Sequence, residues 1–157
     1  MKQLRILNTR DVKRLQKLLG EQHGAAMPAD VAFLQDHKNH IFLVTRDVMR
    51  VDLEQLRLNS LGLYVGEMNA YGELRLSIEG SQLLGLHATK NICELDAEQV
   101  RTYFRGEEIT LDPSQQPEGQ PFLLLKYRND FLGAAKCKDG KLLNYLPKVH
   151  RTHDIIL

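Results

Sequence analysis

The residues between Phe122 and Arg151 carry the densest set of anion-binding side chains in this 157-residue chain. Seven lysines and arginines lie there with only two aspartates, so the local net charge is +5 in a chain whose total is +1. Each Lys or Arg that neutralises a phosphate releases a counterion, so this pattern favours contact with a nucleic-acid backbone. A strand-rich segment whose charges are merely solvated explains the same composition, and charge alone does not separate the two interpretations.

The charge elsewhere in the chain is distributed unevenly. Residues 86–125 hold three basic and seven acidic residues, a local net charge of −4. A split of this kind fits a protein with one basic face. It also fits an internal network of salt bridges, and the sequence leaves both explanations open.

Two pairs of histidines have a spacing that could suggest metal ligands. They are His37-x-x-His40 and His150-x-x-His153. No cysteine pair or acidic cluster completes a tetrahedral set, so structural or solvated histidines are the favoured interpretation and no metal site is expected.

No catalytic motif is present in the sequence. Glu107 and Glu108 are adjacent in a predicted strand, where neighbouring side chains point to opposite faces, so they do not converge on one substrate. Phosphate-binding, dinucleotide-binding and serine-hydrolase motifs are absent. We therefore predict a protein without catalytic residues or a cofactor, although a small enzyme whose site assembles from distant residues stays open.

Composition places the chain among globular proteins. Its apolar fraction of 43% and charged fraction of 26% are ordinary for that class. Cys93 and Cys137 are far apart and form no CxxC motif, and we recognise neither a signal peptide nor a run long enough to span a bilayer. The expected location is the cytoplasm, with both thiols reduced and no membrane partner.

The first half of the chain mixes helices and strands. Thr9 is expected to cap a helix that ends at or near Gly20, because apolar residues recur on one face between them. The other predicted elements are a short helix over 29–35, a buried strand over 40–45, helical turns over 52–58, two strands over 62–67 and 73–78, and a junction over 81–86.

The second half has one helix and several short strands. Asp96 is a good cap for a helix over 97–104, and Gly106 can adopt the left-handed conformation that ends it. The other expected elements are a strand or lead-in over 91–95, a strand over 107–111, a loop over 112–119, a hairpin of 122–128 with 131–137, a tight turn at 139–140 followed by 141–144, an irregular stretch over 145–151 and a last strand over 152–157.

These elements predict an α+β protein with two domains. A small mixed domain occupies residues 1–85, and a small, mostly β barrel occupies residues 86–157.

The second half resembles a PUA domain, the pseudo-barrel found in many RNA-modifying enzymes and ribosome-assembly factors. Leu95 to Ile109 look like that family's opening helix, glycine turn and following strand. Leu132-Gly133-Ala134-Ala135-Lys136, with the stretch from Gly140 to Arg151, is similar to the LG-x-x-K … G-x-x-x-N-x-x-PK-x-x-R segment of the PUA-like module in RNA cytosine-5 methyltransferases of the Nol/Nop/Sun class. The layout of a short N-terminal (pre-PUA) domain before a PUA domain also looks like the Nip-type ribosome-biogenesis proteins.

The resemblance implies RNA binding through the helix-to-strand turn and the last strands. A glycine lets the backbone approach a phosphate, cations neutralise it, Tyr145 could stack on a base, and Asn144 could bond a base edge or a 2′-hydroxyl. Each residue also has a purely structural explanation: a turn glycine, an Asn that caps its own turn, or a core Tyr. The predicted RNA-binding residues are Arg105, Gly106, Lys136, Lys141, Asn144, Tyr145, Lys148 and Arg151.

The catalysis of the methyltransferases does not carry over to this sequence. Neither their glycine-rich cofactor loop nor a cysteine preceded by proline is present, since Cys93 follows Ile92 and Cys137 follows Lys136. The prediction is a non-catalytic RNA-binding protein acting in modification of ribosomal or transfer RNA or in ribosome biogenesis, with an RNA-modifying enzyme or assembly factor as a candidate partner. The alternative is a protein-docking adaptor in a ribosome-assembly complex, with the strands between residues 64 and 78 offering an apolar edge.

Overall fold

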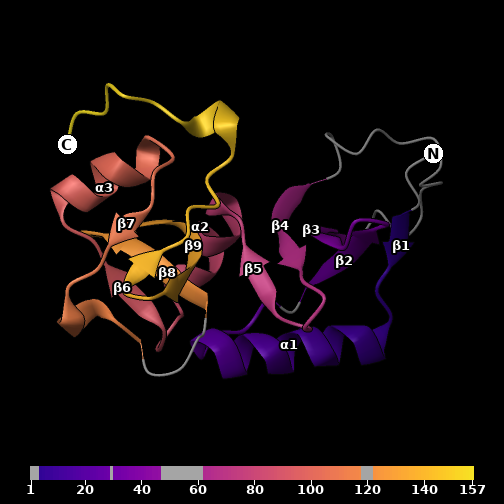
Figure 1. The fold of residues 1–157 in the computed structure, drawn as a ribbon. Helices are drawn as coiled ribbons and strands as arrows, with labels where there is room; N and C mark the ends of the chain where they lie inside the picture. The colour runs from indigo at the N-terminus through magenta and orange to yellow at the C-terminus, as the bar shows by residue number, and fades with distance from the viewer. Residues whose placement is uncertain (1–3, 29, 47–61, 118–121) are drawn as a thin grey trace.

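The computed structural model describes residues 4–28, 30–46, 62–117 and 122–157. In these ranges the chain forms three α-helices and two five-stranded sheets, which is the α+β architecture that the sequence predicts. Figure 1 shows the two sheets side by side, with helix α1 running along the base of the first and helix α2 between them.

The first sheet is an antiparallel meander in which every strand pairs with the next along the chain. Its strands are β1 (Leu4–Ile6), β2 (Val31–Asp36), β3 (His40–Thr45), β4 (Leu63–Met68) and β5 (Leu74–Leu76). Both the strand predicted over 40–45 and the pair of strands around the turn at 69–72 are confirmed.

Helix α1 (Thr9–His23) covers one face of this sheet. Asn8 caps it by accepting a hydrogen bond from the Asp11 amide at 2.9 Å, and Leu15 and Leu19 are buried on its inner face. The helix passes through Gly20 and ends at Gly24, which is left-handed at φ 63°. The prediction that Thr9 is the cap was therefore wrong, because Thr9 is the first helical residue. The helix ends near Gly20, as expected, but three residues beyond it, because the left-handed residue that closes it is Gly24.

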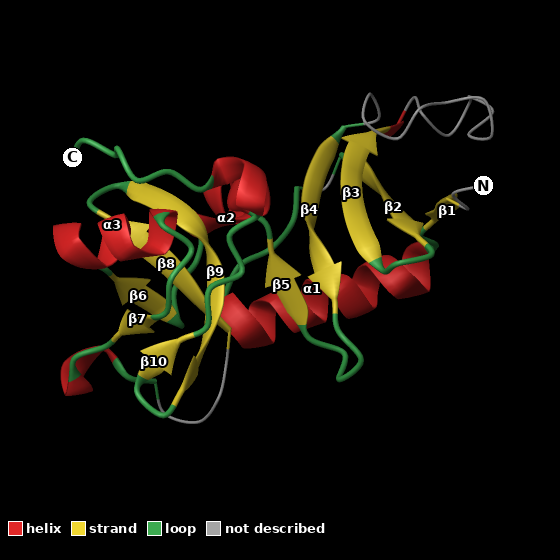
Figure 2. Cartoon of the chain, turned by 45° about the horizontal axis from the view of Figure 1, so that its top comes forward, coloured by secondary structure: helices red, strands yellow, loops and turns green. Residues whose placement is uncertain are grey.

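The second sheet has the strand order β6-β8-β9-β10-β7, and β6 and β8 run parallel. Helix α3 lies on the crossover between them, as Figure 2 shows. The elements are β6 (Ile92–Glu94), α3 (Ala97–Phe104), β7 (Ile109–Thr110), β8 (Phe122–Tyr127), β9 (Asp130–Lys138) and β10 (Lys141–Leu142), with short 3₁₀ turns at Pro113–Gln115 and Lys148–His150.

Three predicted elements differ in the structure. Residues 31–36 form strand β2, where the sequence predicts a helix. Residues 78–85 form helix α2 (Ile78–Gly85), where the sequence predicts the end of a strand and a junction. Residues 152–157 form no strand, although one is predicted there. Strand β2 is apolar on both faces, since Phe33 packs in one cluster and Ala32 and Leu34 in another, so it shows no alternation in sequence. The helical turns expected over 52–58 lie outside the described residues.

Helix α2 joins the two sheets by close backbone approach. Ser77 caps it by accepting a hydrogen bond from the Gly80 amide at 2.9 Å. A Cβ on Gly80 would overlap the Val65 carbonyl of β4, and a Cβ on Gly85 would overlap the Phe131 ring of β9. The two glycines therefore let one short helix pack against both sheets at once.

The apolar core has a cluster that includes residues of both sheets. Leu19 of α1, Phe33 of β2 and Leu84 of α2 pack in one buried cluster with Leu124 of β8 and Phe131 of β9. A second cluster fills the barrel interior around Val100, Leu125 and Leu142. One face of the β8–β9 hairpin therefore packs on the first half of the chain and the other face closes the barrel. Among the described residues no helix is long and apolar enough to cross a bilayer.

Candidate nucleic-acid interface

The turn that follows α3 forms the centre of the predicted RNA-binding surface. Asp96 caps this helix by accepting a bond from the Gln99 amide at 2.8 Å, and the Gln99 side chain returns one to the Asp96 amide at 2.9 Å. Gly106 ends it with φ 80°, as predicted. A Cβ at Gly106 would overlap the guanidinium of Arg151, so the bare backbone makes room for this cation.

The segment from Asn144 to Thr152 lies across the end of α3 and is held there by hydrogen bonds. The amide nitrogen of the Asn144 side chain donates to the Tyr103 carbonyl at 2.9 Å and to the Glu107 carbonyl at 2.8 Å. The Asn144 side-chain oxygen accepts from the Leu146 amide at 2.9 Å, and the Thr152 amide donates to the Phe104 carbonyl at 2.7 Å. These bonds give the Phe104 and Glu107 carbonyls a partner, and they add a second donor at the Tyr103 carbonyl, which already accepts from the Gly106 amide at 2.9 Å. Contact of Asn144 with RNA stays a prediction, and both hydrogens that it would use are already donated within the chain.

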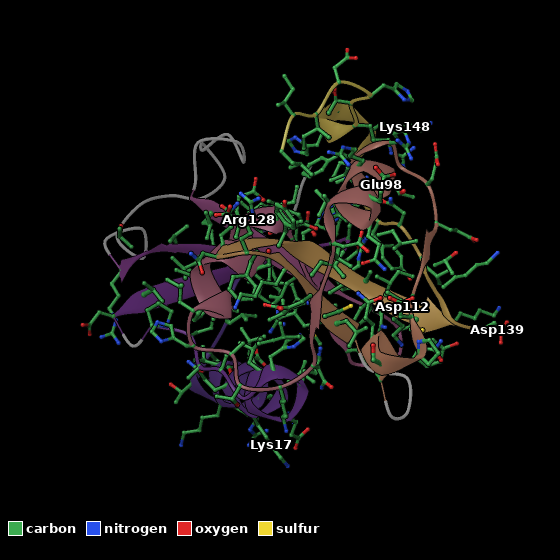
Figure 3. All side chains as sticks on the ribbon, turned by 90° about the vertical axis from the view of Figure 1, so that its left-hand side faces the viewer. Lys17, Glu98, Asp112, Arg128, Asp139 and Lys148 are labelled. Atoms are coloured by element: carbon green, nitrogen blue, oxygen red, sulfur yellow. The ribbon has the colours of Figure 1, made fainter. Side chains whose placement is uncertain are left out.

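Three predicted cations lie on this crossing segment and turn. Arg151 is exposed and donates from Nε to the Leu146 carbonyl at 3.1 Å. Arg105 makes a 3.2 Å ion pair with Glu107. Lys148 is exposed, and its ammonium group has no polar partner within the described part of the chain. Figure 3 shows Lys148 at the end of the molecule opposite Lys17.

Lys136 lies apart from these residues. It projects from β9 toward the first sheet, where its Nζ forms a 2.7 Å ion pair with Glu73 and lies 4.8 Å from the centre of the Phe122 ring. Burial raises the pKa of Glu73, but hydrogen bonds from Lys136 and Asn69 lower it more, so this pKa is below its ordinary value. The structure thus uses Lys136 as a bridge between the two sheets.

Lys141 also lies apart, in β10 directly after the turn at Asp139 and Gly140. It is exposed and stands opposite Lys138 and Thr110 in the ladder. Figure 3 places Asp139, at the tip of this hairpin, well away from Lys148. The structure therefore brings together Arg105, Gly106, Asn144, Lys148 and Arg151, and leaves Lys136 and Lys141 outside that surface.

Tyr145 faces the first sheet from the crossing segment. The Arg75 guanidinium lies 4.5 Å from the centre of its ring, and Tyr145 as a residue is 37% exposed. Beside it is a cavity of about 200 Å³ lined by side chains from both halves of the chain, including Tyr64, Ser77, Tyr103, Pro147 and His150. One face of the Tyr145 ring already carries a cation, so a base stacked on this ring would take the other face.

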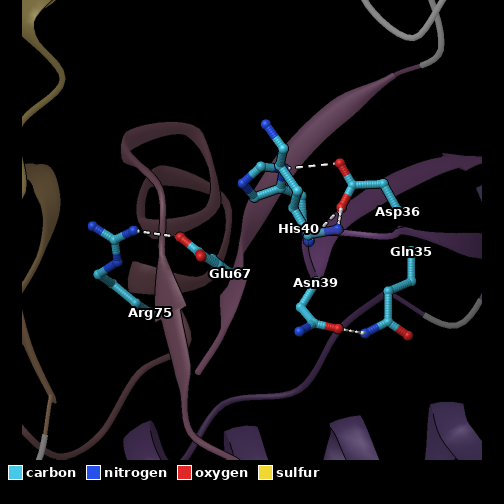
Figure 4. A network of polar contacts seen from close by, with 7 residues as sticks. Gln35, Asp36, Asn39, His40, Glu67 and Arg75 are labelled. Carbon is cyan, nitrogen blue, oxygen red and sulfur yellow. Dashed lines mark hydrogen bonds and ion pairs between the residues drawn. The ribbon is translucent and has the colours of Figure 1, made fainter. Parts of the chain in front are cut away.

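The sequence does not predict that Arg75 lies beside the candidate site. Strand β5 holds it beside Tyr145, and Glu67 pairs with it at 2.7 Å, as Figure 4 shows. The signal in the sequence was the alternation around β5, which directs Glu73 and Arg75 to the face opposite Leu74 and Leu76. That pattern indicates that the Arg75 side chain lies outside the core, but it does not identify Tyr145 and Glu67 as its contacts.

The spacing His37-x-x-His40 belongs to a turn between β2 and β3. Figure 4 shows the His40 ring beside the Asp36 carboxylate, with Nδ1 2.9 Å from Oδ2. Burial raises the pKa of Asp36, but hydrogen bonds from His40 and the Lys38 amide lower it by more. The pKa of Asp36 is therefore below its ordinary value. No group of three metal-ligating side chains occurs in the described ranges.

The two cysteines are both free thiols, and Cys93 is buried in the barrel core. Burial, with a smaller effect of Cys137, raises the pKa of the Cys93 thiol to about 11. A thiol with that pKa stays protonated at neutral pH, so Cys93 lacks the thiolate that nucleophilic chemistry needs.

The second sheet, α3 and the crossing segment define a PUA-like module. Residues 90–152 match the family model described as the methyltransferase RsmF PUA domain, which confirms the resemblance seen in the sequence.

The relatives found among curated proteins carry one name. The chain is similar to ribosomal RNA small subunit methyltransferase F of Shewanella oneidensis, with 24% identity over 140 residues, covering 88% of this chain and 28% of that protein. The protein of the same name in Vibrio cholerae is 26% identical over 126 residues, covering 80% of this chain and 25% of its own length. The chain therefore spans less than a third of these relatives, and the similarity extends beyond the PUA-like module into the first half of the chain.

Proposed function

We propose that this chain binds structured RNA, ribosomal RNA in particular, during its modification, and that it does so without catalysing a reaction itself. The match of residues 90–152 to a PUA domain supports RNA binding. The name of the relatives supports ribosomal RNA of the small subunit as the substrate to test first. Their remaining length, beyond what this chain covers, is where a methyltransferase activity would belong.

The observation that carries this proposal is the position of Arg151 over Gly106. The hydrogen bonds of Asn144 and Thr152 fix the crossing segment before any ligand binds, so the backbone that carries Arg151 and Lys148 loses little conformational freedom on binding. A phosphate that meets this turn is contacted by a guanidinium and an ammonium on an already ordered backbone. We assign contact with RNA to Arg105, Lys148 and Arg151, and a positioning role to Gly106 and Asn144.

The test compares K148E/R151E with the parent in binding to a transcript of small-subunit ribosomal RNA over a series of salt concentrations. Because each phosphate contact contributes about 0.7 to 0.9 to the slope of log affinity against log salt, loss of two contacts should reduce that slope by roughly 1.5. A matched control is K38E/K90E, which reverses two exposed lysines outside the predicted surface.

The single variant K148E controls for misfolding of the double variant. The substitution removes no polar contact, because the Lys148 ammonium has no polar partner among the described residues. It should lower the slope by about half as much as the double variant. A folded K148E/R151E protein that binds like the control would overturn the proposed surface.

The adaptor alternative depends on an open strand edge between residues 64 and 78. Strand β5 is the last strand of the first sheet, but it also packs against β8 and β9. Capture of partners from lysate with and without RNase separates the two functions, because an adaptor keeps its partner after the RNA is destroyed.

A further inference from the structure

The outer face of α1 carries a stripe of four cations that the resemblance to PUA domains does not explain. Arg10, Lys13, Arg14 and Lys17 occur at the spacing i, i+3, i+4 and i+7, so they share one face of the helix. All four are exposed, and together with Thr9 they line a shallow hollow. We call these four residues the α1 stripe.

The α1 stripe is short of anionic partners. Lys17 has a long 3.9 Å contact with Glu21, whereas Arg10, Lys13 and Arg14 make no ion pair with any residue that the structure describes. The other acid of the helix, Asp11, is bound to Arg5 at 2.7 Å. Within the stripe, each cation has like-charged neighbours three or four positions away, an arrangement that disfavours a helix. A bound polyanion would relieve this repulsion.

The position of the helix limits what that polyanion can be. A basic amphipathic helix on a membrane inserts its apolar face, but the apolar face of α1 is buried, with Leu15 5% and Leu19 0% exposed. The outer face of this packed helix is predominantly cationic, with Glu21 at its end, which suits the regularly spaced phosphates of a nucleic acid.

We propose that the α1 stripe is a second RNA-binding surface, which contacts the phosphate backbone independently of the surface around Arg151. This inference rests on the proposed RNA-binding function. Figure 3 shows Lys17 and Lys148 at opposite ends of the molecule, and Figure 1 likewise places α1 at the base and the last residues at the top. Two such surfaces would let the chain lie between two segments of a folded RNA.

The variant R10E/R14E tests this inference with little risk to the fold. Glu is a good helix former, negative charge at position 10 is favourable in the first turn of the helix, and each new acid has a remaining lysine three positions later. In binding to the small-subunit ribosomal RNA transcript, the salt slope should fall by roughly 1.5, and the effects of R10E/R14E and K148E/R151E should add. K38E/K90E again provides the control of equal charge change.

A second measurement uses the unaltered protein. Acetylation of lysines followed by mass spectrometry should show Lys13 and Lys17 protected by the transcript, and Lys38 unprotected. If R10E/R14E binds like the control while K148E/R151E loses affinity, the second surface does not exist but the proposed function stands. If neither variant changes RNA binding, both proposals fail. Protection of Lys13 and Lys17 by poly-L-glutamate, but not by RNA, would instead make the stripe a protein-docking site and overturn the inference.

Discussion

His23, the last residue of α1, is fully buried, and among the described residues neither ring nitrogen has a full hydrogen bond, since the nearby Lys90 backbone compensates only in part. Burial lowers its pKa from 6.5 to about 4. The unfolded chain therefore binds a proton at this residue more readily than the folded chain. Its contribution to stability is complete above pH 6.5 and is lost progressively as the pH falls toward 4, by about 2 kcal/mol at pH 5.

We expect H23L to remove this part of the pH dependence. Urea unfolding at pH 7 and pH 5 should show a smaller loss of stability for H23L than for the parent, by about 2 kcal/mol. Asp36 and Glu73 have lowered pKa values, so their contributions are lost only below the ordinary pKa of a carboxyl group and do not overlap with this window. The exposed His87 supplies the control H87Q, which should behave like the parent. An unchanged loss of stability in H23L would mean that another group titrates.

At the scale of residues, local backbone conformation could be predicted from the sequence, whereas the partners of individual side chains could not. Glycine at 106 and its left-handed conformation followed from the helix pattern. The roles of Asn144 and Lys136 could not be predicted from the sequence. Asn144 bonds to Tyr103, 41 positions away, and Lys136 bonds to Glu73, 63 positions away. Spacing along the chain carries no information on such contacts.

The turn between α3 and β7 provides a prediction at the scale of elements. G106A should destabilise the protein and weaken RNA binding together, because the added methyl group strains a backbone at φ 80° and displaces the Arg151 guanidinium. G72A is a matched control, since Gly72 has φ 77° and no atom within 4 Å of an added Cβ.

Both variants should lose about 1 kcal/mol of stability from backbone strain, and G106A should lose more. Only G106A should reduce the salt dependence of RNA binding, as measured with the ribosomal RNA transcript. Equal RNA binding by G106A and G72A would contradict the role assigned to Arg151.

Elements with a strong local signal were predicted from the sequence, and those defined by distant contacts were not. The cap at Asp96 and the hairpin turn at Asp139 and Gly140 depend on neighbouring residues, and the structure confirms both predictions. Helix α2 has only eight residues, including two glycines, which makes it a poor helix by propensity. It forms because Gly80 and Gly85 allow close packing on Val65 and Phe131, which no local pattern reveals.

At the scale of the whole molecule, the two sheets share structure that a division at residue 85 does not suggest. The buried cluster around Leu19 and Phe33 includes Leu124 and Phe131 of the second sheet. The ion pair between Glu73 and Lys136 crosses the same contact. The division into residues 1–85 and 86–157 stays a prediction, and the shared core argues that the two parts unfold together.

A single substitution in the barrel interior tests whether they do. Leu142 is completely buried in the second cluster, on the side of the hairpin away from the first sheet, so L142A should cost about 3 kcal/mol. If the chain unfolds as one unit, the slowest-exchanging amides of β3 should lose protection by the same free energy, although the buried residues of β3 belong to other clusters than Leu142. Hydrogen exchange followed by mass spectrometry measures this in both halves at once.

The reciprocal variant makes the test symmetrical. L19A removes a fully buried side chain from α1 and should lower the protection of β8 and β9 amides, because Leu19 packs in the cluster that also holds Leu124. Unchanged protection of β3 in L142A would show that the halves open independently. In that case the two proposed RNA-binding surfaces could move relative to each other, whereas cooperative unfolding would mean that the RNA meets them at a fixed separation.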